Sequence, residues 1–271
     1  MSELWSWSAP VQGDIALPTE RVDCWAVALA ALPADAEATA TALLSADERA
    51  RAERFRFDRH RRLYISSHAA LRLLLARYLR ASPASLVIAA EANGRPILAS
   101  PAGRLQFNVS HSGDLALVAV SCIAPLGVDI EEVRDLPDFV DIARRYFAPT
   151  EVEHLLRLAP RERLGGFFVT WTRKEAFVKA LGLGLSFPLD AFCTGRPDRP
   201  PSLTQAEGAA DADWTMADLL PGGEYKGALA IRHPSVKIDC RQAAWSWLLD
   251  GVHLQGPNAG PTWAADRSPD T

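Results

Sequence analysis

The stretch that decides the fold is Phe168-Val-Thr-Trp-Thr-Arg-Lys-Glu-Ala-Phe-Val-Lys-Ala-Leu181. Its apolar residues, with Phe167 just before them, recur at helical spacing and predict an amphipathic helix: Phe168, Trp171, Val178 and Leu181. Glu175 and Lys179 stand at i and i+4, and Trp171 stands one turn before Glu175, so that acid, base and aromatic ring share one ridge. Taken alone, such a pair is most simply an ion pair on the helix surface, which contributes little stability.

The chain of 271 residues has the composition of an ordinary globular protein, 48% hydrophobic and 23% charged. Its net charge of −4 provides no electrostatic footprint for nucleic acid. The first ten residues hold no cationic segment or long apolar run, so we expect no signal peptide, and no apolar stretch is long enough for a membrane span. Four widely spaced cysteines without a CxxC pair favour reduced thiols over a disulfide framework or a zinc site: Cys24, Cys122, Cys193 and Cys240. We therefore expect a cytoplasmic protein without nucleic-acid or membrane partners.

The first half of the chain reads as a strand, two helices and two further strands. An apolar run at residues 22–32 predicts a buried strand. Ser45 and Glu48 have the spacing of a capping box, which opens a helix through about Phe55. Leucines at helical spacing predict a second helix over residues 64–79. Strands are expected at residues 105–109 and 115–120, with a tight polar turn over residues 110–114.

The second half repeats this order. We expect a strand at residues 126–131, a capping box at Thr150 and Glu153, the helix quoted above, and strands at residues 227–231 and 244–249. When Tyr64 is superposed on Trp171, His68 pairs with Glu175 and Arg72 with Lys179. The alternative is coincidence between two common patterns of helix and strand.

The repeat predicts an α+β fold of two similar α+β halves related by pseudo-two-fold symmetry, with the active site in the cleft between them. The expected division is an N-terminal half at 1–124 with contacts to the substrate, and a C-terminal half at 125–250 with the catalytic carboxylates. Residues 251–271 are expected to form a flexible tail or a strap on the surface.

Asp129 and Glu131 are the first candidates for chemistry. In a strand they project to the same face, about 7 Å apart at Cα, while Val128 and Ile130 face the core. Adjacent carboxylates repel each other unless a cation lies between them, and a small set of oxygen ligands suits Mg²⁺. By itself this pattern is usually a solvated strand face. Glu175 would supply a third carboxylate, and Lys179 would neutralise a phosphate beside the metal.

Ser110 and His111 are poorly placed as a catalytic pair, because neighbouring residues of a strand point to opposite faces. An anion-binding turn is the better interpretation, and a histidine satisfied within its turn is the alternative. In the arginine-rich segment after Ser45, Arg51, with Arg62 as a second candidate, would clamp a phosphate, although a solvated basic face is the simpler interpretation. Gly94-Arg95-Pro96 is most simply a turn, and the functional interpretation adds a cationic side chain and open backbone near a nucleotide.

Three segments together resemble the signature motifs of the 4′-phosphopantetheinyl transferases of the larger, surfactin-synthetase-activating (Sfp-like) type: Phe107-Asn-Val-Ser-His-Ser-Gly113, Gly127-Val-Asp-Ile-Glu131 and Trp171-Thr-Arg-Lys-Glu-Ala-Phe-Val-Lys-Ala180. The likeness runs from about Ser45 to Ile231. Each motif alone is weak, whereas their order and spacing are specific. That family is built from two similar α+β halves in one chain and is usually monomeric.

The resemblance implies transfer of the 4′-phosphopantetheine arm of coenzyme A to a serine of an apo acyl or peptidyl carrier protein, with release of adenosine 3′,5′-bisphosphate. Asp129, Glu131 and Glu175 would hold Mg²⁺. Glu175 would also be the base, and Lys179 would contact the pyrophosphate. The remaining contacts to coenzyme A would come from Ser110, His111, Arg51, Gly94, Arg95 and Pro96. The pathway served would be fatty-acid, polyketide or nonribosomal-peptide biosynthesis.

Two positions depart from the family pattern. Arg95 stands where many relatives have lysine, and Glu48 stands near a position that is often basic. Both bear on how the 3′-phosphate is bound. The carboxylates alone also suit a Mg²⁺-dependent phosphohydrolase or nuclease, and the fold would suit a non-catalytic nucleotide-binding relative. The presence of all three carboxylates and Lys179 favours the transferase.

Overall fold

The computed structural model describes residues 7, 13–91, 94–184, 187–204, 213–253 and 262–263. Its helices are α1 (Glu37–Leu43), α2 (Ala46–Ala52), α3 (Asp58–Leu79), α4 (Phe139–Tyr146), α5 (Pro149–Arg157), α6 (Pro160–Leu181) and α7 (Trp245–Leu249). Its longer strands are β1 (Arg21–Ala28), β4 (Gln106–Ser112), β5 (Leu115–Ser121), β6 (Leu126–Glu132), β7 (Thr215–Leu219), β8 (Tyr225–Ile231) and β9 (Lys237–Gln242). Two small ribbons consist of β2 (Val87–Ala90) with β3 (Pro96–Ser100), and β10 (Val252–His253) with β11 (Thr262–Trp263). No helix in the described ranges is long and apolar enough to span a membrane.

Two sheets pack against each other between two long helices. One sheet has the strand order β4-β5-β1-β9 and the other β6-β8-β7. Alternate residues of β1 divide between two cores: Trp25 and Val27 pack with the residues of α3, whereas Val22 and Cys24 pack with the strands of the second sheet. The outer face of the second sheet packs on α6 through Ala228. This layering confirms the predicted α+β fold.

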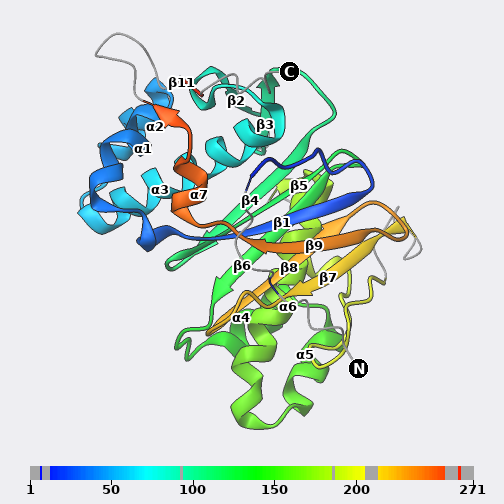
Figure 1. The fold of residues 1–271 in the computed structure, drawn as a ribbon. Helices are drawn as coiled ribbons and strands as arrows, with labels where there is room; N and C mark the ends of the chain where they lie inside the picture. The colour runs from blue at the N-terminus through cyan, green and yellow to red at the C-terminus, as the bar shows by residue number, and fades with distance from the viewer. Residues whose placement is uncertain are drawn as a thin grey trace.

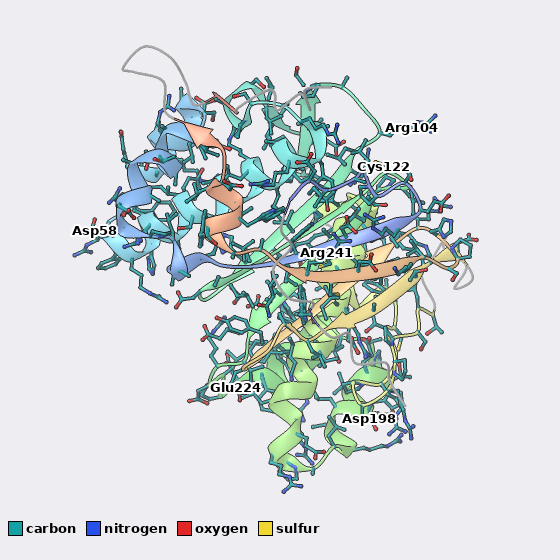
Figure 2. The ribbon with its side chains drawn as sticks, in the orientation of Figure 1. Asp58, Arg104, Cys122, Asp198, Glu224 and Arg241 are labelled. Carbon is teal, nitrogen blue, oxygen red and sulfur yellow. The ribbon has the colours of Figure 1, made fainter. Side chains whose placement is uncertain are left out.

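Figure 1 shows the helices in two groups on opposite sides of the strands, with α1, α2, α3 and α7 at the upper left and α4 and α5 at the bottom. Side chains drawn in Figure 2 mark the same division, because Asp58 lies on the first group while Asp198 and Glu224 lie toward the second. Arg241 lies between them, on β9. The pseudo-two-fold relation between the halves stays a prediction.

Two predicted capping boxes and one predicted turn can be compared with the structure. The predicted capping box at Ser45 is present, since Ser45 Oγ accepts from the Glu48 amide at 3.1 Å and Glu48 Oε2 accepts from the Ser45 amide at 2.7 Å. The second predicted capping box is wrong. The helix begins at Pro149, and Glu151 accepts from the amide of Ala148 instead. A proline at the first helical position outweighs the threonine that follows it. The expected turn at residues 110–114 is shorter, because β4 continues through Ser112.

The prediction of a strand at residues 244–249 is also wrong, because these residues form α7. Trp245 and Trp247 imitate the alternation of a strand. In the helix, Trp247 stacks on Trp25 with ring centroids 5.2 Å apart, and the Trp245 indole donates to Ala28 O. Tertiary contacts of two large rings thus overrode a local pattern of period two.

β9 joins the sheet of the N-terminal strands, parallel to β1, with Val22 opposite Ile238 and Cys24 opposite Cys240. Residues 237–242 therefore belong structurally with strands from before the predicted division at residue 125. Of the predicted tail at 251–271, β10 and β11 form an antiparallel ribbon. The other tail residues, apart from Gly251, lie outside the described part of the chain.

Candidate active site

The second half of helix α6, from Thr170 to Ala180, is buried except along one stripe. Trp171, Glu175 and Lys179 are partly exposed, whereas the residues between them are buried: Thr172, Arg173, Lys174, Ala176, Phe177 and Val178. The three exposed positions are one helical turn apart and line one ridge, as the spacing predicted. A buried helix with a single polar stripe presents that stripe to a cleft, and not to bulk solvent on an open surface.

Two cations of α6 that precede Glu175 anchor the helix and do not reach the cleft. Arg173 donates from Nε and Nη2 to both carboxylate oxygens of Asp218, at 2.7 and 2.6 Å. Lys174 forms a fully buried ion pair with Glu151 at 2.7 Å and also donates to Phe192 O. Burial lowers the pKa of Lys174, and the charge of Glu151 opposes that shift. These contacts fix the rotation of α6 about its axis and thereby the direction of its polar stripe.

Gly127 lets β6 approach α6 closely. A Cβ at this position would collide with Ala176 O and Ala180 N of the helix backbone. The glycine of the G-V-D-I-E motif therefore serves backbone contact between strand and helix. The contact brings Asp129, two residues further along β6, beside the polar stripe of α6.

β4 and β6 belong to different sheets and are joined by side chains. Ser110 Oγ donates to Asp129 Oδ1 at 2.8 Å, and Ser112 Oγ donates to Glu131 Oε2 at 2.7 Å. Asn108 Oδ1 accepts from the Val128 amide at 2.9 Å. Three alternate residues of β4 thus meet β6 one after another. Asn108 and Ser112 were missed as site residues, although their period of two along the S-H-S segment was a readable signal.

Lys179 closes the site from the side of α6. Its Nζ lies 2.6 Å from Asp129 Oδ1, 3.0 Å from Ser110 Oγ and 3.2 Å from Val128 O. The Asp129 side chain is 6% exposed and that of Lys179 is 28% exposed. The sequence predicted a pair between Glu175 and Lys179 on one helix. The structure shows Lys179 paired with Asp129 across the junction of helix and strand.

Burial and neighbouring charges shift the pKa values of Glu175 and Glu131. Burial raises the pKa of Glu175, and the charges of Asp129 and Glu131 raise it further, whereas Lys179 opposes the shift. Burial likewise raises the pKa of Glu131, a shift that the hydrogen bond from Ser112 offsets and the charge of Asp129 reinforces. The charge of Asp129 raises the pKa of both Glu131 and Glu175, so the junction holds negative charge that a bound cation would relieve.

The donor set fits a hard divalent cation such as Mg²⁺. Asp129 Oδ2 is buried and has no hydrogen-bond partner, although Oδ1 of the same carboxylate is occupied by Ser110 and Lys179. A buried carboxylate oxygen without a partner is costly and marks a place for a ligand. Among the described residues, no group of three His, Cys, Asp or Glu side chains is gathered as a complete metal site. A cation here would therefore take further ligands from water and substrate, as Mg²⁺ does.

The residues predicted to contact coenzyme A divide between two cavities that β4 connects. One cavity, of about 190 Å³, is lined by Gly94, Arg95, Pro96, Asn108, Val109, Lys179, Gly182 and Gly184. The other, of about 500 Å³, is lined by Arg51, Phe55, Arg59, His60, Leu63, Tyr64, His68, His111, Ser112 and Gly113. Ser110 faces β6 between them, and His111, on the opposite face of β4, faces the second cavity. Arg62 belongs to neither cavity, because it donates to Leu32 O and lies beside Glu37.

A third cavity, of about 450 Å³, opens on the other side of Glu175. Arg145 and Asp190 contribute charged side chains to its lining. The other lining residues are mostly apolar: Tyr146, Trp171, Val178, Phe187, Pro188 and Leu189. Trp171 is held there by stacking on Phe167, with ring centroids 5.9 Å apart. Glu175 thus separates an apolar cavity from the polar junction that contains Asp129 and Lys179.

Glu48, which departs from the family pattern, turns toward the protein. Its Oε2 accepts from Arg72 Nε at 2.9 Å and from the Ser45 amide. Burial favours the neutral acid, but the bonds from Arg72 and Ser45 outweigh it and lower the pKa of Glu48. The carboxylate is therefore engaged by the buried Arg72 and by the helix N-terminus.

Comparison with known proteins decides the family. Residues 125–230 match the 4′-phosphopantetheinyl transferase superfamily, and residues 32–123 match a family described as 4′-phosphopantetheinyl transferase, N-terminal. The chain is 34% identical over 224 residues to the 4′-phosphopantetheinyl transferase HetI of Nostoc sp., across 82% of this chain and 92% of that protein. The chain belongs to the 4′-phosphopantetheinyl transferase superfamily. The resemblance read from the three motifs is thereby confirmed.

Two other members of the superfamily come from Bacillus subtilis. A 4′-phosphopantetheinyl transferase is 32% identical over 206 residues, across 75% of this chain and 88% of that protein. The 4′-phosphopantetheinyl transferase Sfp of strain 168 is 29% identical over 209 residues, across 76% of this chain and 90% of that protein. The two family matches include both long helices, α3 and α6, and the chain is a phosphopantetheinyl transferase by family and an enzyme by class.

Proposed function

We propose that this phosphopantetheinyl transferase moves the 4′-phosphopantetheine arm of coenzyme A to a serine hydroxyl of an apo acyl or peptidyl carrier protein, with Mg²⁺, and releases adenosine 3′,5′-bisphosphate. The observation that carries the proposal is the convergence of Asp129, Glu131, Glu175 and Lys179 where β6 meets α6. Phosphoryl transfer to a weak nucleophile depends on positioning and charge neutralisation, and this junction offers both.

In the proposed reaction, the serine oxygen attacks the phosphorus that carries the pantetheine arm. A new P–O bond forms, and the bond from this phosphorus to the bridging oxygen breaks. Glu175 accepts the serine proton, and its raised pKa makes it a better base than an ordinary carboxylate. Lys179 Nζ, which is paired with Asp129 in the structure, offsets the negative charge that develops on the departing phosphate.

Asp129, Glu131 and Glu175 would hold the magnesium ion. The buried Oδ2 of Asp129 is the oxygen that now has no partner, and Ser112 orients the carboxylate of Glu131. Bound Mg²⁺ would supply charge neutralisation on the pyrophosphate. Ser110 has the same positioning role for Asp129 that Ser112 has for Glu131.

Coenzyme A would lie along β4, with its adenosine in the cavity formed by Gly94, Arg95 and Pro96 and its 3′-phosphate in the cavity of Arg51 and His111. The pyrophosphate would then lie at Lys179, which lines the first cavity and contacts Ser110. The apolar cavity beside Glu175 would receive the pantetheine arm and the carrier serine from the opposite side. This arrangement would bring the nucleotide of coenzyme A and the acceptor serine to opposite sides of the proposed base.

Intact-mass analysis tests the proposal. The purified protein is incubated with Mg²⁺, coenzyme A and a panel of apo carriers from fatty-acid, polyketide and nonribosomal-peptide systems. We expect one carrier to gain the mass of one phosphopantetheine group, and a carrier whose acceptor serine is replaced by alanine to gain none. Unchanged masses across the whole panel would refute the transferase function. Cleavage of coenzyme A in the absence of any carrier would identify a phosphohydrolase instead.

A further inference from the structure

The cavity of about 500 Å³ between α2, α3 and β4 contains a residue to which no role has been assigned, His68. His68 lies on α3, and His111 reaches the same cavity from β4 while Arg51 reaches it from α2. The Tyr64 ring packs against the imidazole and restricts it, with ring centroids 3.9 Å apart and ring planes tilted by 31°. A fixed imidazole beside an arginine and a second histidine is suited to an anion.

The surroundings of His68 determine its tautomer. Nδ1 lies 2.9 Å from Tyr64 O and 3.2 Å from Ser67 Oγ. A backbone carbonyl can only accept, so Nδ1 carries the hydrogen. In the neutral ring, Nε2 on the opposite edge is then a bare lone pair and cannot donate to an anion. His68 becomes a donor at Nε2 only when it takes up a second proton.

Charged groups from three elements face His68. Glu48 on α2 favours the protonated ring, whereas Arg51 on α2 and His111 on β4 disfavour it. On the same helix as His68, the backbone carbonyl of Tyr64 accepts from His68 Nδ1, and Arg72 forms an ion pair with Glu48. Burial, followed by His111 and Arg51, lowers the pKa of His68. Without an anion, the ring is therefore neutral at physiological pH, and a bound phosphate would reverse that balance.

We propose that His68 is a specificity-determining residue that, in its protonated form, donates from Nε2 to the 3′-phosphate of coenzyme A. The inference rests on the proposed function, because that function supplies the ligand. Binding of coenzyme A takes up a proton at His68, whereas binding of 3′-dephospho-coenzyme A takes up none there. The preference for the phosphorylated ligand consequently increases as the pH falls from 8.5 to 6.5, a range in which the phosphate monoester keeps most of its second charge.

Calorimetric titration of the full chain with coenzyme A and with 3′-dephospho-coenzyme A tests this role. Comparison of two buffers with different ionisation enthalpies gives the number of protons taken up. For His68→Leu we expect the affinity for coenzyme A to fall about tenfold to hundredfold, which corresponds to one charge-assisted hydrogen bond. The affinity for 3′-dephospho-coenzyme A should stay as in the wild type. His68→Gln keeps a donor without a titrating group, so it should restore part of the affinity but no proton uptake at this position.

His233, in the turn after β8, serves as the control, and His233→Leu should change neither affinity nor proton uptake. Equal ligand preference in wild type and His68→Leu, or an equal loss for both ligands, would overturn the role of His68. If coenzyme A binds with proton uptake but no carrier is modified, the proposed function fails and the role of His68 stands. If the wild type binds neither ligand, both fail together.

Discussion

Helices α3 and α6 have equal length, 22 residues each, and each packs on the outer face of its own sheet. The superposition of the two halves pairs Arg72 of α3 with Lys179 of α6. The two cations differ in their surroundings. The Arg72 side chain is 2% exposed and bonds to Glu48 and to Leu86 O, whereas that of Lys179 is 28% exposed and faces Asp129 at the cleft.

The difference shows that position on a helix does not decide whether a cation is structural or functional. What decides it is whether the groups around the cation are fully satisfied. Arg72 donates from Nε to the carboxylate of Glu48 and from Nη1 to the backbone carbonyls of Pro83 and Leu86. Lys179 meets a carboxylate whose second oxygen is buried without a partner. A buried polar group that lacks a hydrogen-bond partner at a cleft indicates a binding site for a ligand.

The largest effect is expected at the α6 stripe. Glu175→Gln removes both a proton acceptor and a metal ligand, so we expect the kcat of carrier modification to fall at least about 1,000-fold, a loss typical of removing one group from a preorganised site. The melting temperature should change little, because Glu175 is partly exposed and neutralisation relieves repulsion from Asp129. Glu153→Gln on α5, where Glu153 forms an exposed pair with Arg157, is the control. Full activity of Glu175→Gln would remove Glu175 from the base and metal roles.

The second effect concerns α3. Arg72→Ala leaves Glu48 and buried carbonyls without their donor, and breaking a buried pair in this way costs roughly 3–5 kcal/mol of unfolding free energy. Activity per folded molecule should stay near the wild-type value, since Arg72 lines none of the three cavities beside the catalytic junction. Denaturant unfolding followed by circular dichroism gives the stability. A small change in stability with a large loss of kcat would remove the contrast between Arg72 and Lys179.

The third effect tests how β6 reaches α6. Gly127→Ala forces the strand away from the helix backbone, and we expect a loss of roughly 1–3 kcal/mol in stability together with lower activity. Gly165→Ala on α6 is the matched control, because a Cβ there meets no atom within 4 Å. That change should stabilise the protein by roughly 0.4–1 kcal/mol. Thermal unfolding of both variants measures the contrast, and equal behaviour would show that the close approach is not needed.

The smallest effect is a pH dependence at Glu48. Hydrogen bonds from Arg72 and Ser45, which outweigh the effect of burial, lower its pKa in the folded protein. The charged form therefore stabilises the fold above the unfolded pKa of about 4.3, and this contribution is lost as the pH falls through the folded value. Relative to Glu48→Gln, the wild type should be about 1 kcal/mol more stable at pH 7, and this advantage should shrink as the pH falls to 3. Urea titrations at the two pH values measure this difference, and a gap that persists unchanged at pH 3 would contradict the assignment.

Most predictions that rested on local period were confirmed, with the strand predicted at residues 244–249 as an exception, and β9, which depends on a distant partner, was missed. The ridge of Trp171, Glu175 and Lys179 follows from helical spacing, and the burial of Val128 and Ile130 follows from strand alternation. β9 was missed because its strand is short and half polar, and its partner β1 lies more than two hundred residues earlier in the chain. The helix α7 was misassigned because its two tryptophans owe their spacing to contacts with β1.

The sequence alone determined the α+β class, the family, and which carboxylates and lysine share a face, since these depend on residue type and on spacing along one element. The tertiary structure decided which polar residues are anchors and which are left for chemistry. It assigned Arg173 and Lys174 to buried contacts, paired Lys179 with Asp129, and placed Ser110 against β6 and His111 at the cavity of Arg51. These outcomes depend on what each side chain meets across the fold, because burial and hydrogen-bond partners come from residues far away in the sequence.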